Sequence, residues 1–209
     1  MAEPLRGSFA TGIAAAGLAA LMLSGCASGV EDAGSGYTAS QLSDPWTVPS
    51  PELSDTDGTA YSLTKSTTKP VTLVFFGYTN CPDICGMVMG NIASALARLN
   101  EDQRDKVEVA FVTTDPARDD GSALRTYLDR YDESFVGLTA PMPQILEAGN
   151  AFHVAIDKGK KLPSGGYDVT HGTQVFLLDS DDEIPMFWGQ DTSPADLSSD
   201  LTTLLKAES

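Results

Sequence analysis

The chain has 209 residues, of which 42% are hydrophobic, and its 13 Lys and Arg against 29 Asp and Glu give a formal net charge of −16. Binding to a phosphate backbone needs a basic surface, so this charge excludes nucleic acid as a partner. The length suffices for one domain with a sizeable core plus a tail, so the three cysteines are not needed as a scaffold.

The first pattern along the chain is an apolar stretch at residues 9–23, preceded by Arg6. It is shorter than the ~20 residues that a membrane-spanning helix needs, which favours a secretory signal peptide. The stretch ends in Leu23-Ser24-Gly25-Cys26, which resembles the lipobox of bacterial lipoproteins. This resemblance implies that residues 1–25 are a lipoprotein signal peptide and that Cys26 becomes lipidated at the new N-terminus. An ordinary secretory signal is the alternative.

The segment after this cysteine, residues 27–44, is rich in Gly, Ser and Ala and has almost no large apolar side chain. Such a composition cannot bury a core, so we expect residues 26–44 to be the lipidated cysteine and a flexible linker. The folded domain is then expected at residues 45–209. A flexible linker of this length reaches roughly 25 Å, which would keep the domain close to the membrane.

From Pro45 onward the hydrophobic pattern alternates between strand and helix. Continuous runs of β-branched and aromatic residues indicate strands that are buried on both faces, whereas apolar residues at intervals of three and four indicate helices. In chain order, we expect a strand at Val71–Phe76, a helix at Pro82–Leu99, a strand at Val107–Thr113, a helix through Leu124, Tyr127 and Leu128, a helix at Pro143–Phe152 and a short strand at His153–Asp157.

The C-terminal part of the chain predicts a hairpin followed by a helix. Gln174–Asp179 and Ile184–Trp188 are strand-like runs joined by polar residues, as in a β-hairpin. Ser193 and Pro194 suit the N-cap and the first position of a helix that runs to Ala207. This order of elements fits several α/β folds and suggests a thioredoxin-like sandwich with a C-terminal β-hairpin and helix.

Cys81 and Cys85 lie in the turn between the first predicted strand and the first predicted helix. Pro82 suits the first helical position, which would place the two sulfurs on one face, one turn apart. This spacing permits a disulfide or the capture of one metal ion, and the helix N-terminus should favour the thiolate. A disulfide that only stabilises the loop is the alternative. A zinc ribbon would need a second cysteine pair, which the sequence lacks.

His171 is one of two histidines, and it lies in a polar loop just before the Gln174–Asp179 strand. In a thioredoxin-like topology, this loop faces the start of the cysteine-bearing helix. Two thiolates and one imidazole form a soft ligand set that suits copper, as Cu(I) or Cu(II). A surface loop position is the alternative for His171. His153 lies in an apolar context and is expected in the core or at a strand edge.

Three motifs of this sequence, in their order and spacing, resemble the Sco/SenC family of cytochrome c oxidase assembly factors. They are residues 77–85 (GYTNCPDIC), residues 115–119 (DPARD) and residues 169–172 (VTHG). The resemblance covers the chain from about Pro49 to its end, and it implies a thioredoxin-like fold. The combination of the two cysteines with a distant histidine is far more specific than the cysteine spacing alone.

The resemblance also implies a function. Cys81, Cys85 and His171 would be copper ligands, on an extracytoplasmic domain that is lipid-anchored to the cell membrane. The protein would help to mature the binuclear copper centre, CuA, of oxidase subunit II. A thioredoxin-like reductant or another copper chaperone would be a further partner.

Two questions about the centre stay open. Asp83 is a candidate for tuning the metal from outside its ligand set, and it would equally favour the helix N-terminus. The alternative function is that of a thiol-disulfide oxidoreductase, in which Cys81 attacks and Cys85 resolves the mixed disulfide.

The sequence departs from the family pattern at three places. Gly86 follows the second cysteine where family members often have Pro, and Asp120-Gly121 stands where a Thr-Pro pair is common. Thr170 replaces the Asp often found before the histidine, which removes a carboxylate that would orient the imidazole. These differences bear on copper affinity rather than on the identity of the ligands.

Overall fold

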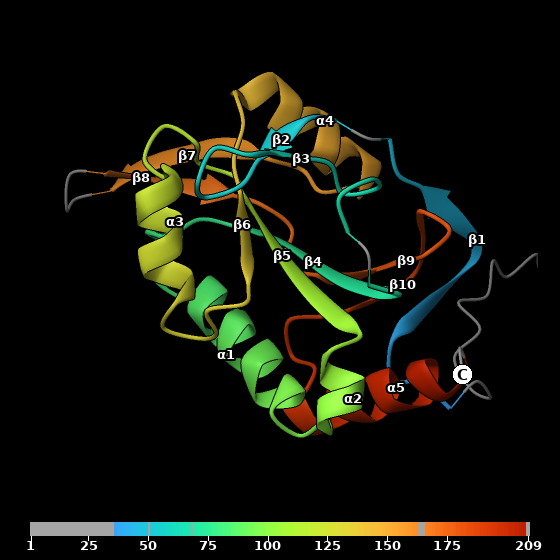
Figure 1. Cartoon of the computed structure of the whole chain (residues 1–209). Helices are drawn as coiled ribbons and strands as arrows, with labels where there is room; N and C mark the ends of the chain where they lie inside the picture. The colour runs from blue at the N-terminus through green and yellow to red at the C-terminus, as the bar shows by residue number, and fades with distance from the viewer. Residues whose placement is uncertain (1–35, 50, 68, 163–165, 208–209) are drawn as a thin grey trace, which may run out of the picture. The chain divides into compact units, whose positions relative to one another are not determined.

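The structure, a computed structural model, describes residues 36–49, 51–67, 69–162 and 166–207 (Figure 1). The expected signal peptide and Cys26 lie outside these residues. Among the helices that are described, none is both long enough and apolar enough to cross a membrane.

A six-stranded sheet organises the domain, in the order β1-β10-β9-β4-β5-β6. Its inner strands β4 (Val71–Gly77) and β5 (Val107–Thr113) are parallel, and β9 (Val175–Asp179) pairs antiparallel with β4. Every residue of β4 is buried, which explains why this strand reads as a continuous apolar run. The cysteine turn follows directly from its end.

The remaining strands are at or near the edges. β6 (Val136–Leu138) runs parallel to β5, while β10 (Glu183–Trp188) and β1 (Ser40–Thr47) extend the other side in antiparallel pairing. Two small ribbons lie outside the main sheet: β2 (Leu53–Ser54) with β3 (Ala60–Tyr61), and β7 (Asp157–Leu162) with β8 (Gly166–Thr170).

Helices cover both faces of the sheet (Figure 1). Alternate residues of β4 point to opposite sides, so Leu73 and Phe75 enter one apolar cluster and Val74 and Phe76 enter the other. The first cluster lies under α1 (Ile84–Leu96), α3 (Gly121–Leu128) and α5 (Pro194–Ala207), and the second under α4 (Met142–Ala151) and the β2–β3 ribbon. A short helix, α2 (Glu101–Arg104), precedes β5.

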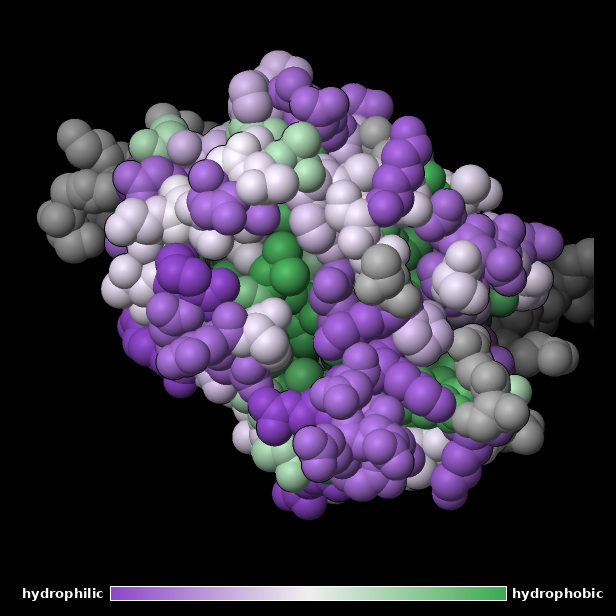
Figure 2. Space-filling model, in the orientation of Figure 1, coloured by the Kyte–Doolittle hydropathy of each residue, from purple (hydrophilic) through white to green (hydrophobic). Residues whose placement is uncertain are grey.

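The surface reflects the composition. In Figure 2 the visible face is mostly hydrophilic, and the apolar residues show mainly in a narrow strip that overlies β6 and the neighbouring part of the sheet. Single exposed apolar side chains are normal on a soluble domain. Among the described residues, most acidic side chains are half-buried or exposed, whereas Asp115, Asp119 and Asp200 are buried.

Most of the predicted elements are confirmed, because β4, β5, β9, β10, α1, α3, α4 and α5 lie in their predicted segments. The hydroxyl of Ser193 accepts a hydrogen bond from the Asp196 N–H (3.2 Å), so the expected cap of α5 is present. Helix α1 starts at Ile84, later than predicted, because Asp83 still has non-helical backbone angles (φ −139°, ψ −84°).

The strand predicted at His153–Asp157 is wrong. His153 has a left-handed backbone (φ 53°), and the Val154 N–H donates to the Gly149 carbonyl (2.8 Å), which closes α4 with a terminal turn. The strand in this region is β7, which starts only at Asp157. His153 is exposed rather than in the core, and its ring packs against Trp46 at 4.1 Å between centroids.

The predicted start of the domain at Pro45 is too late. Residues 40–44, expected in the linker, belong to β1 and pair with β10. Ahead of them, the Thr38 hydroxyl (2.7 Å) and the Ala39 N–H (3.0 Å) both donate to the buried carboxylate of Asp200 on α5. An edge strand is held by backbone hydrogen bonds and needs few apolar side chains, so composition alone did not reveal it.

Candidate metal centre

The cysteine turn lies where β4 ends. Beyond the strand, Tyr78 is buried and its carbonyl accepts a hydrogen bond from the Cys81 N–H (3.2 Å). Cys81 is half-buried ahead of α1, whereas Cys85 is fully buried in the first turn of the helix. Neither cysteine is in a disulfide. The turn thus presents one accessible sulfur and one enclosed sulfur.

The two thiols influence each other in opposite directions. The Cys81 sulfur accepts a hydrogen bond from the Cys85 N–H (3.4 Å). Hydrogen bonding from the Cys85 thiol lowers the pKa of Cys81 to about 3, against the opposing effect of burial. The same hydrogen bond, together with burial, raises the pKa of Cys85. Without metal, the pair is therefore a thiolate at Cys81 and a thiol at Cys85.

His171 lies in the loop between β8 and β9. A carbonyl oxygen can only accept, so the contact of Nδ1 with the Gly172 carbonyl (2.7 Å) places the proton on Nδ1. The other nitrogen, Nε2, faces the Cys85 sulfur at 3.4 Å. The ring meets Phe75 and Tyr78 edge-on, at 6.1 and 5.7 Å between centroids. These contacts orient the free nitrogen toward the cysteines.

The structure brings the three predicted site residues together. One ligand atom from each of Cys81, Cys85 and His171 lies within 4.8 Å of the others. Two sulfurs and one imidazole nitrogen at this separation can converge on a single soft metal ion, and copper is the metal that this set suits. The predicted approach of the histidine loop to the cysteine turn is thus observed.

Asp83 is placed differently from these three residues. It occupies the N-cap position of α1, is exposed, and makes no capping hydrogen bond with its side chain. Its backbone N–H instead hydrogen-bonds to the Cys81 sulfur and helps to lower the pKa of that thiol. Any influence of this residue on the thiolate therefore comes through its backbone.

The departure at Asp120-Gly121 has a structural explanation. The Asp120 side chain accepts a hydrogen bond from the Ala123 N–H (2.8 Å). Asp120 therefore serves as the N-cap of α3, a position that Thr also suits. At Gly121, a side chain would collide with a neighbouring loop, because a Cβ there would lie 2.2 Å from the Thr56 carbonyl oxygen. The glycine thus allows a close approach of two backbones.

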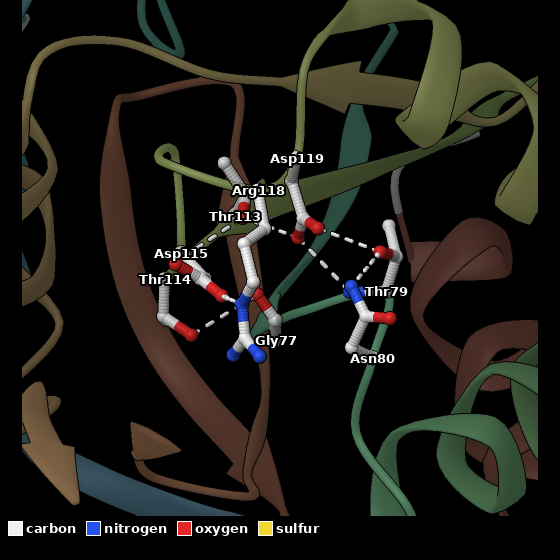
Figure 3. A network of polar contacts seen from close by, with 8 residues as sticks. All are labelled: Gly77, Thr79, Asn80, Thr113, Thr114, Asp115, Arg118 and Asp119. Atoms are coloured by element: carbon white, nitrogen blue, oxygen red, sulfur yellow. Dashed lines mark hydrogen bonds and ion pairs between the residues drawn. The ribbon is translucent and has the colours of Figure 1, made fainter. Parts of the chain in front are cut away.

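Sequence reasoning did not identify Asp119 as a residue that contacts the cysteine turn. Its carboxylate is fully buried and accepts hydrogen bonds from Thr79 in the turn and from Thr113 at the end of β5 (Figure 3). The available signal was its place in the DPARD motif, residues 115–119. A carboxylate with no apolar run around it reads as a surface residue until the fold is known.

The fold and this centre define a class of protein: a thioredoxin-like α/β domain with two cysteines in a strand–helix turn and a histidine from a distant loop. More particularly, the chain belongs to the SCO1/SenC family, whose model matches residues 41–206. The family resemblance noted in the sequence is thereby confirmed.

Relatives with known names agree with this membership. A mitochondrial SCO2 homologue from Danio rerio is 36% identical over 110 residues, which are 52% of this chain and 39% of that protein. A SCO2-like protein from Rickettsia conorii is 30% identical over 149 residues, or 70% of this chain and 71% of that one. The chain spans about half the length of most of the curated relatives it matches.

A solved structure supports the fold. The structure of Bradyrhizobium japonicum ScoI with copper bound superposes with a TM-score of 0.65 and 28% identity, covering 77% of this chain and 97% of that one. The predicted thioredoxin-like fold is confirmed by this similarity and by the observed sheet order.

Proposed function

We propose that this protein is a copper-binding assembly factor that helps to mature the CuA centre of cytochrome c oxidase subunit II. The observation that carries the proposal is the convergence of Cys81, Cys85 and His171 within 4.8 Å. Membership of the SCO1/SenC family supports it, as do the copper in a 28% identical ScoI structure and the description of Sco proteins as cytochrome c oxidase assembly proteins. Copper is then the cargo of the protein.

The sulfurs of Cys81 and Cys85 have different roles in the binding and release of copper. Cys81 is already a thiolate and is half-buried, so it is the first group to meet an incoming ion. Cys85 gives up its proton when the metal binds, because a coordinating thiol must be deprotonated. On release, thiolates of the acceptor displace the accessible Cys81 first, and His171 and Cys85 follow. Each exchange keeps the ion bound to soft ligands throughout.

The proposed location is extracytoplasmic, with Cys26 lipidated and anchored to the cell membrane. The lipobox-like sequence before this cysteine supports the anchor. Because Thr38 is already tied to the domain, the chain between them can extend over at most about 40 Å. Replacing Cys26 by Ala and following the protein between membrane and soluble fractions tests this part. Retention on the membrane of a C26A protein from which residues 1–25 have been removed would contradict lipidation.

The copper-binding part of the proposal is tested by anaerobic Cu(I) titration of the full chain against a chromophoric chelator. We expect one bound ion, and an affinity at least about 10-fold lower in Cys81→Ser, Cys85→Ser and His171→Ala. His153→Ala is the matched control, since its exposed ring lies against Trp46 rather than at the centre. If His171→Ala binds copper with unchanged stoichiometry, spectrum and affinity, the histidine is not a ligand.

The transfer part needs the acceptor. Protein loaded with Cu(I) is mixed anaerobically with the metal-free, reduced CuA domain of subunit II. A one-electron oxidant such as ferricyanide then converts the two transferred Cu(I) ions to the mixed-valence CuA centre, whose visible spectrum is recorded. We expect the CuA spectrum to form with wild type and to fail with Cys81→Ser. An unrelated copper–thiolate protein of equal affinity serves as the control; equally fast transfer from it would show that no dedicated factor is needed. Another copper chaperone and a thioredoxin-like reductant are proposed as the partners that reload and reduce the centre.

A second candidate function is favoured by the asymmetry of the two thiols. In a thiol-disulfide oxidoreductase, the Cys81 thiolate attacks a target disulfide and releases one target thiolate, and Cys85 then forms the Cys81–Cys85 disulfide and frees the second. Two electrons pass to the target, and an external dithiol restores the pair. The test is exchange with an oxidised peptide that copies the copper loop of subunit II. Cys85→Ser should trap the mixed disulfide, and negligible exchange by wild type would remove this function.

A further inference from the structure

A buried carboxylate stands behind the cysteine turn. Asp119, in the loop between β5 and α3, is 0% exposed. It accepts hydrogen bonds from the N–H (2.9 Å) and the hydroxyl (2.6 Å) of Thr79, and from the hydroxyl of Thr113 (2.7 Å) (Figure 3). Burying a carboxylate is costly unless donors surround it, so these three hydrogen bonds hold both loops in one arrangement.

A second connection joins the same two loops. The Thr114 N–H (2.7 Å) and hydroxyl (3.1 Å) both donate to the carbonyl of Gly77, at the end of β4. The Thr113 hydroxyl also accepts a hydrogen bond from the Asp115 N–H (3.0 Å). This hydrogen bond fixes the loop after β5, which carries Asp119. The turn is thus held at the strand end and again two residues later.

A movement of Thr79 would affect both the imidazole ligand, His171, and the accessible sulfur ligand, Cys81. It follows Tyr78, whose ring meets the His171 ring edge-on and whose carbonyl accepts the Cys81 N–H. A shift at Thr79 therefore changes the support of the imidazole and the position of the accessible sulfur. Asp119 makes no hydrogen bond to the three ligand side chains in the contacts described, so its hydrogen bonds reach the centre through Thr79. Its negative charge also acts directly: after the hydrogen bond with Cys81 and burial, it is a smaller cause of the raised pKa of the Cys85 thiol.

We propose that Asp119 is a positioning residue for the centre. The carboxylate holds Thr79 through both its N–H and its hydroxyl. It thereby keeps the turn in the conformation that brings the sulfur of Cys81 close to the Cys85 sulfur and the His171 ring nitrogen. This deepens the proposed function and rests on it for the copper measurements. The positioning role applies to the metal-free protein as well, because the conformation of the same turn affects the equilibrium for forming the Cys81–Cys85 disulfide.

Two hydroxyl deletions on the same carboxylate separate positioning from stability. Thr79→Val removes the hydroxyl donor on the turn and leaves the Thr79 N–H in place, and Thr113→Val removes the hydroxyl donor on β5, with nearly equal change in shape. Thr113 is fully buried and its hydroxyl makes two hydrogen bonds, so its loss should destabilise the fold at least as much. Thr79→Ser restores the hydroxyl. These variants avoid replacing the buried Asp119, whose substitution could prevent folding.

Cu(I) affinity and the glutathione redox equilibrium of the Cys81–Cys85 disulfide are measured on the full chain. We expect Thr79→Val to lower Cu(I) affinity and the equilibrium constant for disulfide formation by about 10-fold each, within the range for outer partners of metal ligands. Thr113→Val and Thr79→Ser should stay within about threefold of wild type, although Thr113→Val melts earlier.

Two results would overturn the proposal: Thr79→Val matching wild type in both measurements, or Thr113→Val changing the centre as much as Thr79→Val does. The disulfide equilibrium needs no metal. If wild type failed to bind copper while the disulfide measurement separated the two variants, the positioning role would stand and the copper function would fail.

Discussion

At the scale of single residues, the centre is asymmetric. Cys81 is half-buried and carries the charge, whereas Cys85 is fully enclosed and keeps its proton. The hydrogen bonds that stabilise the Cys81 thiolate come from the neighbouring thiol and from backbone N–H groups at the start of α1. Reagents, metal ions and partner thiols therefore meet Cys81 first.

This asymmetry predicts the pH dependence of alkylation. A pKa of about 3 for Cys81 means that its thiolate predominates from pH 5 to pH 7, so the rate with iodoacetamide should be nearly flat there. The rate of an ordinary thiol with a pKa of about 8.5 would increase about tenfold for each pH unit over the same range. The rate at Cys81 is read from its peptide by mass spectrometry, on metal-free reduced protein.

The control for this measurement is Cys85→Ala. It removes the principal donor to the thiolate, so the pKa of Cys81 should rise and the rate should regain a slope with pH. A tenfold increase per pH unit in the unsubstituted protein would contradict the assigned thiolate.

At the scale of elements, the start of α3 depends on a close approach of two backbones. Gly121→Ala should cost about 1–3 kcal/mol, since its Cβ would lie 2.2 Å from the Thr56 carbonyl oxygen and the loop would have to move. Gly90→Ala, inside α1 and with open space at its Cβ, is the matched control and should be neutral or stabilising by up to about 1 kcal/mol. Urea denaturation measures both, and equal stability of the two variants would refute the close approach.

The first strand predicts where the domain can be shortened. A chain that begins at Pro45 loses part of β1 and also Thr38 and Ala39, which donate to Asp200. The remaining donor is the Trp188 indole N–H (2.8 Å), so we expect a loss of about 2 kcal/mol or more relative to a chain that begins at Gly36. Thermal melting of the two shortened chains checks this, and equal melting temperatures would show that the N-terminal tie contributes nothing.

At the scale of the whole molecule, copper should stabilise the fold. An ion that binds only the folded state at 100 times its dissociation constant adds about 2.7 kcal/mol. For a domain of this size the melting temperature should rise by roughly 5–10 °C. We expect the full rise in wild type and His153→Ala and at most about half of it in Cys85→Ser, whose affinity is expected to be at least about 10-fold lower. Removal of copper with a chelator should reverse the rise. A rise in Cys85→Ser of the same size would place the ion elsewhere.

How much of the molecule could be predicted follows from how each part is stabilised. β4 is buried on both faces, so its sequence is apolar throughout and the strand is recognisable. β1 has mostly exposed side chains, and β6 has three residues, so neither leaves a hydrophobic pattern. His153 ends α4 through its backbone conformation, which an apolar neighbourhood in the sequence does not reveal.

In the candidate metal centre, too, some features leave a local sequence pattern and others do not. Cys81 and Cys85 are close in sequence, so their spacing alone suggested a shared site. His171 is 86 residues from Cys85, and its approach follows from topology and the family motif rather than from local pattern. Asp119 lies 40 residues from Thr79, and its role is visible only when the two loops are seen side by side.

The hydrogen bonds from Thr38 and Ala39 to Asp200 on α5 have a mechanical consequence. Force applied along an anchored N-terminus would enter the domain at Thr38 and Ala39 and pass through the Asp200 carboxylate into α5. It would not pass first through the turn that carries Cys81. If Cys26 is lipidated as proposed, tension on the anchored chain would pass into α5 before it reached the turn that carries Cys81 and Cys85.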